Sequence, residues 1–308
     1  MIIVFGSLNM DMVFLVEEMP TPGETVLCAD YSLHPGGKGA NQAVAAARDG
    51  AHVKMYGCVG LDAFGQNLMD TLSASGVDCT GIARTGRPTA CAAICVDAKA
   101  ENMITVASGA NLEAESTSIP DGELGPETTL ILQMEVELQQ NLALMRRARA
   151  HGTRILLNLA PASPLPEEAL DLVDILVVNQ TEAQQLASAF HIPHTKPREI
   201  ARHLSAQYGL WCVVTQGDQG AYLSTPEGDW SVAALPIKPC DTTGAGDAFV
   251  GVFAASLENN MAPEAALQRA VAASGLACTR QGAITSLETG TEIDAALAQV
   301  PQVVAIAS

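Results

Sequence analysis

The chain of 308 residues is 48% hydrophobic, which is enough apolar material for one large α/β domain or for two ordinary domains. Its formal net charge of −18 disfavours a nucleic acid or an anionic membrane surface as partner, so the expected partner is a small molecule. No apolar run approaches the length of a membrane span, and the eight cysteines include no C-x-x-C pair. We therefore expect a cytoplasmic protein with reduced thiols and without a zinc site.

A short apolar run at residues 2–5 predicts a buried strand that leads into a polar segment. Open α/β sheets bind ligands at the carboxyl ends of their strands, so Asn9 and Asp11 are candidates for recognising substrate hydroxyl groups. A structural role in a turn accounts for these two side chains equally well. The lone Gly6 is not a G-x-G-x-x-G fingerprint, and this disfavours a dinucleotide-binding enzyme.

Two segments of the chain interrupt the rhythm of strands and helices. Segment 12–34 combines apolar stretches with a Pro-Thr-Pro-Gly turn, and segment 88–107 has apolar stretches on both sides of a polar loop at 97–102. The predicted strands of these segments lie at 13–16, 25–27, 89–96 and 103–106. Such strands can build a small separate sheet, and at the ligand-bearing edge this sheet would be a lid that excludes water. A surface hairpin without function is the alternative.

A glycine-rich segment, Gly-Gly-Lys-Gly-Ala-Asn-Gln at 36–42, opens an Ala-rich helix that ends near Gly50. Adjacent glycines before a helix let a ligand approach the backbone closely. Lys38 is followed by glycine and not by Ser or Thr, so the segment is not a Walker A loop. A tight turn before an ordinary helix would also use glycine, but the whole pattern favours a binding role, with Asn41 able to add an amide contact.

The rest of the chain alternates between strands and helices, which predicts a parallel, doubly wound sheet. The predicted strands lie at 53–59, 129–134, 154–159, 174–178 and 211–215, and the predicted helices at 63–75, 136–150, 166–172, 181–189, 196–209 and 263–279. Polar residues stand near the ends of three strands: Glu135, Asn158 and Asn179. Asn179 and Glu182 suit a helix start, or alternatively the orientation of water molecules around Mg²⁺. The glycine-rich loop 216–220 either admits a flat nucleotide base or simply turns the chain.

The segment Asp-Thr-Thr-Gly-Ala-Gly-Asp at 241–247 runs into an apolar helix, because Phe249, Val252 and Leu257 recur on one face. Small residues at a helix N-terminus let an anion approach N–H groups that have no intrahelical partner. Asp247 lies in the first turn, within reach of a group that faces the anion, as a general base must be. Taken alone, Asp247 is more economically explained as complementing the helix dipole. The polar strand ends and the second glycine-rich helix start reverse that preference and predict phosphoryl transfer to a hydroxyl.

Five motifs together resemble the ribokinase family of sugar kinases, and in order and spacing they cover nearly the whole chain. They are Gly-Ser-Leu-Asn-Met-Asp at 6–11, Pro-Thr-Pro-Gly-Glu-Thr at 20–25, Asn-Gln-Thr-Glu at 179–182, and the segments 36–42 and 241–247. The resemblance implies a ribokinase-like three-layer αβα fold with a doubly wound, mostly parallel sheet. It further implies a single domain over 1–308, with a β-sheet lid from segments 12–34 and 88–107 that often forms a homodimer.

The resemblance also assigns roles to individual residues. The sugar would be held by six residues: Asn9, Asp11, Gly37, Lys38, Asn41 and Glu135. Phosphoryl transfer would use Asp247 as the base, itself in contact with the sugar, and an anion hole formed by Gly244, Ala245 and Gly246. The site for ATP would comprise Asn179, Thr215, Gln216, Gly217, Gly220 and Gly246, with Glu182 organising Mg²⁺ and its waters. A monovalent cation, expected to be K⁺, would correspond to Asp241, Thr243, Ala277, Arg280, Gly282 and Ser286.

We therefore expect an ATP-dependent kinase that phosphorylates D-ribose at O5 to give D-ribose 5-phosphate. Kinases of deoxyribose, fructose or a nucleoside share segment 241–247 and remain alternatives, as do a nucleotide-dependent oxidoreductase and a catalytically silent sugar sensor. The oxidoreductase lacks its glycine fingerprint, and a sensor would have lost the base or the anion hole, whereas both are present. A nucleoside kinase needs a roomy apolar lid over the base, whereas the compact segment 36–42 suits a bare pentose.

Overall fold

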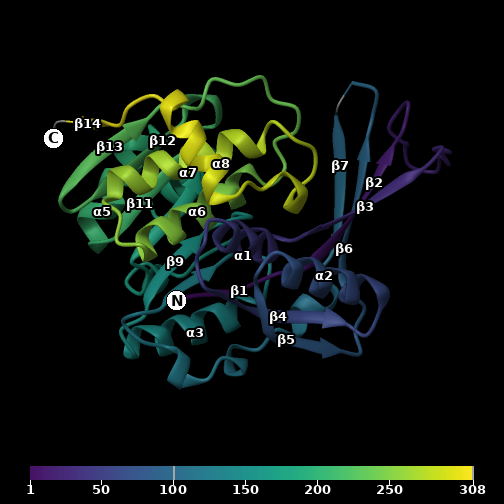
Figure 1. The fold of residues 1–308 in the computed structure, drawn as a ribbon, viewed down its shortest axis with the longest axis horizontal. Coiled ribbons are helices and arrows are strands. Elements are labelled where there is room, and N and C mark those ends of the chain that lie inside the picture. Colours follow the sequence, from purple (N-terminus) through teal and green to yellow (C-terminus); the bar gives the residue numbers. More distant parts are fainter. Residues whose placement is uncertain (100, 307–308) are drawn as a thin grey trace.

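The computed structural model of the protein describes residues 1–99 and 101–306, which form a ten-stranded main sheet and a smaller second sheet (Figure 1). The main sheet has the order β14-β13-β12-β11-β10-β9-β8-β1-β4-β5. Its pairs from β11 through β5 are parallel, and its pairs from β11 to β14 are antiparallel. The strands are β1 (Ile2–Phe5), β4 (Val53–Gly60), β5 (Asp78–Thr85), β8 (Thr129–Leu132), β9 (Arg154–Asn158), β10 (Ile175–Asn179), β11 (Trp211–Thr215), β12 (Ala221–Thr225), β13 (Gly228–Val232) and β14 (Val304–Ile306).

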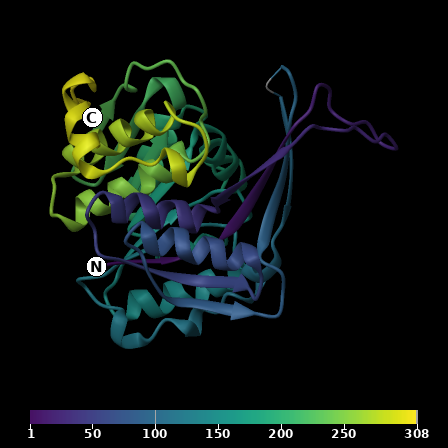
Figure 2. The same cartoon turned by 45° about the vertical axis from the view of Figure 1, so that its right-hand side comes forward.

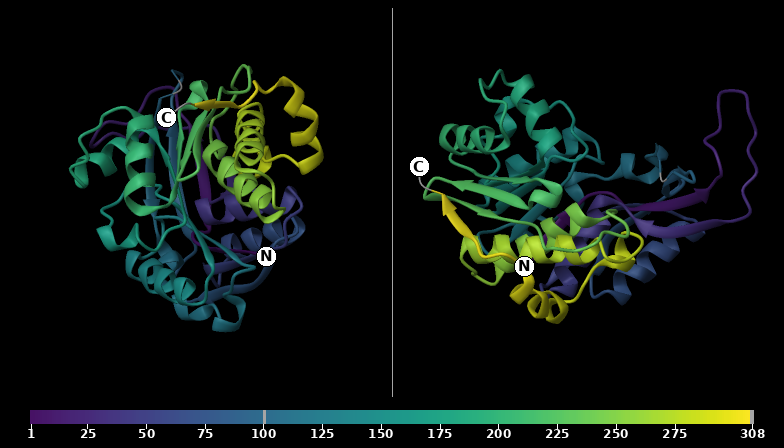
Figure 3. Two further views of the ribbon diagram at one scale, coloured as in Figure 1. Left: turned by 90° about the vertical axis from the view of Figure 1, so that its left-hand side faces the viewer. Right: turned by 90° about the horizontal axis from the view of Figure 1, so that it is seen from above.

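Helices cover both faces of the main sheet (Figure 3). One layer contains α1 (Lys38–Arg48), α2 (Ala63–Ala74), α6 (Ala245–Glu258), α7 (Pro263–Ala277) and α8 (Gly290–Ala296), and the other contains α3 (Leu138–Ala150), α4 (Gln180–Ala189) and α5 (Pro197–Tyr208). Along β1, Ile2 and Val4 pack toward the first layer, whereas Ile3 and Phe5 pack toward the second. All four are fully buried, because a strand covered on both faces requires a continuous apolar run. The predicted three-layer fold is confirmed.

The second sheet has four strands in the order β3-β2-β6-β7 and projects from the body of the molecule (Figure 2). Its strands are β2 (Asn9–Leu15), β3 (Tyr31–Gly36), β6 (Ala90–Val96) and β7 (Asn102–Ala107). The two segments expected to build a small separate sheet therefore do so. Asn9 and Asp11 belong to β2 and do not form a turn. These polar residues after β1 therefore lie at the base of the small sheet.

One predicted strand of the small sheet is wrong. Residues 25–27 form no strand, and Leu27 is 91% exposed. The antiparallel partner of β2 is instead β3, where Phe14 lies opposite Tyr31 with ring centroids 5.8 Å apart. A cross-strand aromatic pair stabilises this register, whereas the apolar residues at 25–27 have no strand to pack against.

One predicted helix is also wrong. In place of a helix at 166–172 the chain makes a 3₁₀ turn at Glu167–Ala169. Prolines at 161, 164 and 166 precede this turn and supply no N–H groups for helical hydrogen bonds, and the chain must already enter β10 at Ile175. The space available is therefore too short for more than one turn.

Among the strands and α-helices of the described residues, six were not predicted from the sequence: β3, β5, β12, β13, β14 and α8. The predicted loop 97–102 includes Ala100, and the predicted domain 1–308 includes residues 307–308, which lie outside the described residues. Within the described part of the chain, no helix has the length and apolarity needed to cross a membrane.

Helix α6 is the most deeply buried helix of the first layer, with Phe249 and Phe253 stacked at a centroid distance of 5.9 Å. Gly251 faces α1, and a Cβ atom there would lie 2.6 Å from the carbonyl oxygen of Gln42 and from Cβ of Ala45. The glycine therefore lets the two helices approach closely. As a result, the N-terminal half of α6 is held against the N-terminal half of α1.

Candidate active site

The N-terminus of α6 has the form of an anion cradle. Gly244, its N-cap, has φ of 77°, and a Cβ atom there would lie 3.1 Å from Cα of Ala283, so glycine is required twice over. A Cβ atom on Gly246 would meet nothing within 4 Å, which leaves the approach to the first turn open. The first N–H groups of a helix have no intrahelical partners, and the helix dipole adds positive potential there. The chemistry of this end suits a phosphoryl group.

Asp247 is held in the first turn of α6 by two amide side chains of α1. Asn41 Nδ2 donates to Asp247 Oδ2 at 2.8 Å, and Gln42 Nε2 donates to Asp247 Oδ1 at 2.8 Å. The Asp247 residue is only 7% exposed. Each carboxylate oxygen keeps a further lone pair, so the group can accept a proton while its orientation is fixed.

Lys38 begins α1 directly after Gly37, whose φ is 92°. The negative charge of Asp247, assisted by that of Glu135, raises the pKa of Lys38 above its usual value, although burial opposes the shift. The backbone N–H of Lys38 donates to Glu135 Oε2 at 3.1 Å, and the hydroxyl of Ser7 donates to the same oxygen at 2.5 Å. Glu135 therefore satisfies the first N–H of this helix, and the ammonium group remains a permanent cation beside Asp247.

Asp11 and Asn9 lie on the side of the small sheet. Together with Lys38, Asn41, Glu135 and Asp247 they form what we call the polar cluster. Burial, together with the charges of Glu135 and Asp247, raises the pKa of Asp11 to about 7. Asn9 is 5% exposed, and its Oδ1 accepts a hydrogen bond of 2.7 Å from Asn111 Nδ2. The Nδ2 group of Asn9 is therefore the group left to act as a donor toward a ligand.

A pocket of about 850 Å³ opens on the other side of the α6 N-terminus. Its wall includes the six residues predicted to form the site for ATP: Asn179, Thr215, Gln216, Gly217, Gly220 and Gly246. Glu182, predicted to organise Mg²⁺, lines a second cavity instead. Apolar side chains, among them Leu235, Ile237 and Val271, line the same pocket. Its volume and its mainly apolar wall with a few polar groups are typical of a site for a small ligand.

A second cavity of about 210 Å³ connects the pocket to the polar cluster. It is lined by Lys38 and Asp247 and by Asn158, Glu182 and Gly244, and it shares Asn179, Thr215, Thr242 and Gly246 with the larger pocket. The two spaces therefore meet at the N-terminus of α6. A group bound in the large pocket can therefore meet a group held by the polar cluster at this junction.

The structure confirms the helix start predicted from Asn179 and Glu182, whereas their role around Mg²⁺ stays a prediction. They form a capping box, in which Glu182 N donates to Asn179 Oδ1 at 2.8 Å and Asn179 N donates to Glu182 Oε2 at 2.7 Å. Glu182 also lines the small cavity, and burial raises its pKa, although the bond from Asn179 and the charge of Lys38 oppose this. The helix start thus presents a buried carboxylate to the junction.

The residues expected around a monovalent cation lie in two chain segments that meet. Asp241 Oδ1 accepts bonds from the N–H and the hydroxyl of Thr243, and Asp241 Oδ2 accepts a bond of 2.8 Å from Gly282 N. Burial acts to raise the pKa of Asp241, but these hydrogen bonds together lower it below its usual value. The loop 280–286 therefore lies against Asp241.

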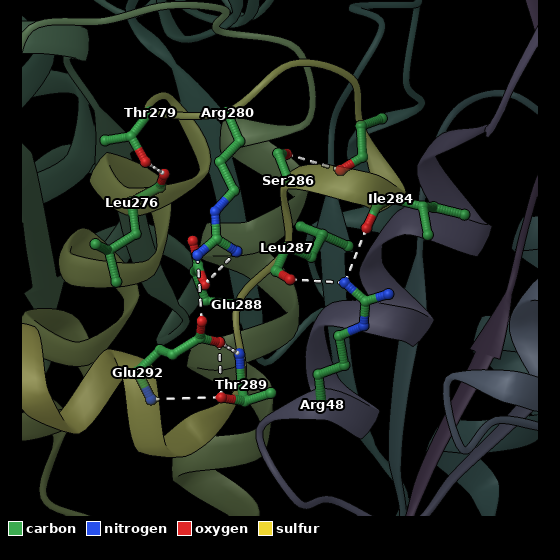
Figure 4. Close-up of polar contacts among 11 residues, drawn as sticks. Arg48, Leu276, Thr279, Arg280, Ile284, Ser286, Leu287, Glu288, Thr289 and Glu292 are labelled. Atoms are coloured by element: carbon green, nitrogen blue, oxygen red, sulfur yellow. Dashed lines mark hydrogen bonds and ion pairs between the residues drawn. The ribbon is translucent and has the colours of Figure 1, made fainter.

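Two of the other three expected residues, Arg280 and Ser286, make polar contacts within the same loop region (Figure 4). The guanidinium of Arg280 contacts Glu288 at 2.8 Å and Glu292 at 3.2 Å, so the main chain of Arg280, and not its side chain, suits the expected role. The hydroxyl of Ser286 donates to the carbonyl of Ala283. The carbonyl of Ala277 accepts the N–H of Arg280 at 3.4 Å.

Several buried amide and hydroxyl groups of the cluster were missed in the assignment of site residues: Ser7, Gln42, Asn111, Gln133 and Asn158. Gln133 Nε2 donates to Gln42 Oε1 at 2.7 Å, and Gln42 Nε2 donates to Asn158 Oδ1 at 3.0 Å. A signal was present, because Gln42 belongs to the glycine-rich segment and Gln133 is a polar residue directly after an apolar strand. Their partners, however, are far apart in sequence.

Comparison with known proteins agrees with this geometry. The pattern of the pfkB family of carbohydrate kinases matches residues 1–290. A ribokinase of Schizosaccharomyces pombe is 34% identical, with 95% of this chain and 96% of the relative covered, and a deoxyribokinase of Salmonella typhimurium is 33% identical, with 92% and 94% covered. The chain belongs to the pfkB family of carbohydrate kinases. It is accordingly a phosphotransferase that acts on an alcohol group of a sugar.

Solved structures of ribokinases share the fold over nearly the whole chain. The ribokinase of Thermotoga maritima superposes with a TM-score of 0.90 at 32% identity, with 96% of this chain and 99% of the other covered. The ribokinase of Arabidopsis thaliana, solved in complex with ribose and ATP, has a TM-score of 0.86 at 27% identity, with 96% and 98% covered. The order of strands and helices described above is therefore that of a ribokinase fold.

Proposed function

We propose that this protein is an ATP-dependent kinase that phosphorylates D-ribose at O5. The observation that carries the proposal is the position of Asp247, which stands at the junction between the polar cluster and the large pocket and is fixed by Asn41 and Gln42. The predominance of ribokinases among the most similar relatives supports ribose as the sugar.

The sugar is proposed to bind in the polar cluster, where donors and acceptors of both kinds converge. Its hydroxyls would be held by Asn9, Asp11, Gly37, Lys38, Asn41 and Glu135. Gly37 lets the start of α1 pack closely against β2, because a Cβ atom there would lie 2.7 Å from the backbone nitrogen of Asn9. Asn41 Oδ1 is buried and has no protein hydrogen-bond partner, so a ligand hydroxyl would satisfy it.

ATP is proposed to bind in the 850 Å³ pocket, with its base against the apolar wall and its phosphates toward the N-terminus of α6. Asn179, Thr215, Gln216, Gly217 and Gly220 would line the nucleotide. Val271, where ribokinase-like sequences can have a polar or aromatic residue near the adenine, contributes to the apolar wall.

In the proposed reaction Asp247 removes the proton from the sugar O5 as this oxygen attacks the γ-phosphoryl group in line. The bond between the γ-phosphorus and the bridging oxygen to the β-phosphate breaks, and ADP leaves. Gly244, Ala245 and Gly246 direct N–H groups at the charge that develops on the transferred group, and Lys38 adds a positive charge. One donor of this kind contributes about 3 kcal/mol to a transition state. Because the groups are already fixed, little reorganisation accompanies the reaction.

Two metal ions are part of the proposal. Among the described residues no three His, Cys, Asp or Glu side chains are grouped to hold a metal, which fits a Mg²⁺ bound through nucleotide oxygens and water, with Glu182 orienting the waters. K⁺ would be held by the carboxylate of Asp241, the hydroxyl of Thr243 and carbonyl or hydroxyl oxygens of Ala277, Arg280, Gly282 and Ser286. This oxygen-rich set fits an alkali cation. When bound, the two ions offset negative charge near the transferred phosphoryl group.

The small sheet is proposed to act as a lid over the sugar within a single domain, and to be the surface of a homodimer. Large apolar side chains remain exposed on it: Leu15, Tyr31, Leu33, Met103, Ile104 and Val106. Exposed apolar patches of this kind are typical of association surfaces. Light scattering of the purified protein gives the mass that tests this assembly.

The decisive experiment measures ADP release with ribose, deoxyribose, fructose and adenosine, each with and without K⁺. We expect the highest kcat/KM with ribose. Preference for deoxyribose or fructose would keep the reaction and change the sugar, and a preference for adenosine with inert ribose would contradict the proposed substrate class.

A further inference from the structure

A chain of buried amide groups connects Asp247 to four other parts of the main body: helix α1, strands β9 and β10, and the end of β8. Gln42 Nε2 donates both to Asp247 Oδ1 and to Asn158 Oδ1, and Gln42 Oε1 accepts from Gln133 Nε2 at 2.7 Å. Asn158 Nδ2 then donates to the carbonyl of Val177 at 3.1 Å. Gln42 and Gln133 are both 0% exposed. Helix α1 and strands β9 and β10, together with the end of β8, thereby support one carboxylate.

The orientation of each amide in this chain is determined by its neighbours. A carboxylate and a main-chain carbonyl are acceptors only, so Asp247 and Val177 must each receive an N–H. Asn158 therefore directs its nitrogen at Val177 and its oxygen at Gln42. Gln42 must then present its NH₂ group to Asp247 and Asn158, which leaves its oxygen for Gln133. No alternative flip of Gln42 keeps these bonds.

The backbone that carries Gln42 is fixed as well. Its carbonyl oxygen lies where a Cβ atom on Gly251 of α6 would come within 2.6 Å, so α1 and α6 are in direct backbone contact one turn after Asp247. Donor and acceptor thus belong to two helices that cannot slide past each other without loss of packing. The hydrogen bond from Gln42 to Asp247 is a consequence of this rigid pair.

We propose that Gln42 is a positioning residue that fixes the rotamer of Asp247 for proton abstraction. Gln42 is fully buried, so it acts on the reaction through the Asp247 carboxylate. Of the two carboxylate oxygens, Oδ1 is held by Gln42, and Oδ2 is held by Asn41, which the proposed function also places at the sugar. The inference rests on the proposed role of Asp247 and not on the identity of the sugar.

The first test replaces the donor with an apolar side chain of similar size. Gln42→Leu should lower kcat about 100-fold, because a small misplacement of a reacting group has this effect. The KM for sugar and for ATP should stay within about twofold, because neither ligand touches Gln42. Gln133→Leu, which leaves Gln42 in place but removes the partner of its oxygen, should lower kcat in the same direction by a smaller factor.

The second test has a readout that a loss of stability alone would not change. Gln42→Glu introduces a carboxyl that can donate to Asp247 only when protonated, so its kcat relative to wild type should rise as the pH falls from 8 to 6. Asp11, Lys38, Glu135 and Glu182 are the other charged groups around Asp247, and they are present in both proteins, so the ratio to wild type removes pH effects that the two proteins share. Gln207→Glu, at an exposed position of α5, is the matched control and should keep a flat ratio.

The outcomes separate this inference from the proposed function. If Asp247→Asn retains near-normal turnover, the base assignment itself fails. If Asp247→Asn is inactive while Gln42→Leu keeps kcat within about threefold of wild type, or lowers it only through a raised KM, the positioning role alone is wrong. Should Gln42→Leu fail to fold, the pH ratio of Gln42→Glu decides, and a flat ratio overturns the inference.

Discussion

The N-termini of α1 and α6 are built alike and lie at the same site, yet they differ in what they offer. Each follows a glycine with positive φ, 92° at Gly37 and 77° at Gly244, and neither has a side-chain cap. The first N–H of α1 is already occupied by Glu135 of the protein. The first turn of α6 is open, because a Cβ on Gly246 would meet nothing within 4 Å.

This difference explains why two glycine-rich helix starts take different roles. At α1 the internal carboxylate of Glu135 occupies the first N–H, so the proposed binding groups at this end are the side chains of Lys38 and Asn41. At α6 no internal anion fills the end, so the backbone itself remains available to an external anion. The side-chain charges at the two helix starts also have opposite signs, because α1 carries the cation of Lys38 and α6 carries the carboxylate of Asp247.

The largest effect is expected when the carboxylate of Asp247 is removed from the N-terminus of α6. Asp247→Asn should lower kcat by about 10³-fold or more, because the amide cannot accept the proton of the sugar hydroxyl. The shape of the side chain is nearly unchanged, so binding of ATP, measured by calorimetry, should stay close to wild type. Near-normal turnover would remove the role of α6 as the carrier of the base.

The next prediction compares a glycine at the start of α6, Gly246, with the glycine before α1, Gly37. Gly246→Val should lower kcat about 100-fold by filling the anion cradle, while the melting temperature stays near that of wild type because the added atoms enter open space. Gly37→Ala should instead destabilise the fold by about 1–3 kcal/mol, because its φ is 92° and its Cβ would crowd the backbone of Asn9. Thermal unfolding and steady-state kinetics on both variants measure the two effects. Equal losses of stability would contradict the difference between the helix ends.

The starts of α1 and α6, each of which follows a glycine, could be predicted from the sequence. The strands β12, β13 and β14 at the edge of the main sheet could not. The bounds of α1 and α6 follow from glycine and apolar periodicity, which are local signals. The antiparallel strands β12 to β14 depend on pairing partners, and β14 pairs with a strand more than seventy residues earlier. Helix α8 had a local signal that was overlooked, since Thr289 and Glu292 form a capping box.

The candidate site shows the same division. Asn9, Asp11, Glu135 and Asn179 could be found because polar side chains follow apolar strands, and parallel strands end at one edge. The contacts of Gln42 and Asn111 could not be predicted, because each depends on which donor meets which acceptor across the fold. Gln42 and its acceptor Asp247 are 205 residues apart in sequence. Spacing within a motif contains no information on such a contact.

A smaller effect concerns the charge that faces the occupied helix end. Burial and the charges of Glu135 and Asp247 raise the pKa of Asp11 to about 7 in the free protein. This raised pKa means that Asp11 favours the folded state below the unfolded pKa near 4, and that this contribution is lost as the pH rises through 7. Sugar hydroxyls donate to the ionised form, so binding should change in the opposite sense.

The Kd for ribose, measured by calorimetry without nucleotide, should therefore fall about tenfold from pH 6 to pH 8. Asp11→Asn should bind more weakly and should lose this pH dependence. Glu135→Gln should lower the pKa of Asp11 and move the transition to lower pH. A wild-type Kd that is constant over this range would show that the ionised form of Asp11 is not needed for the sugar.

The smallest effect is expected at Asp241, which precedes α6 and is in contact with the loop 280–286. Asp241→Asn removes the negative charge but keeps the size of the side chain, so the increase of kcat by K⁺ should be lost while the rate without K⁺ stays within about fivefold, the equivalent of about 1 kcal/mol. Arg280→Gln is the matched control, because its guanidinium contacts Glu288 and Glu292 and not Asp241. It should keep the response to K⁺. Since Gly282 N donates to Asp241, a loss of K⁺ response in both variants would mean that the position of the loop 280–286, and not the charge of Asp241, controls the open end of α6.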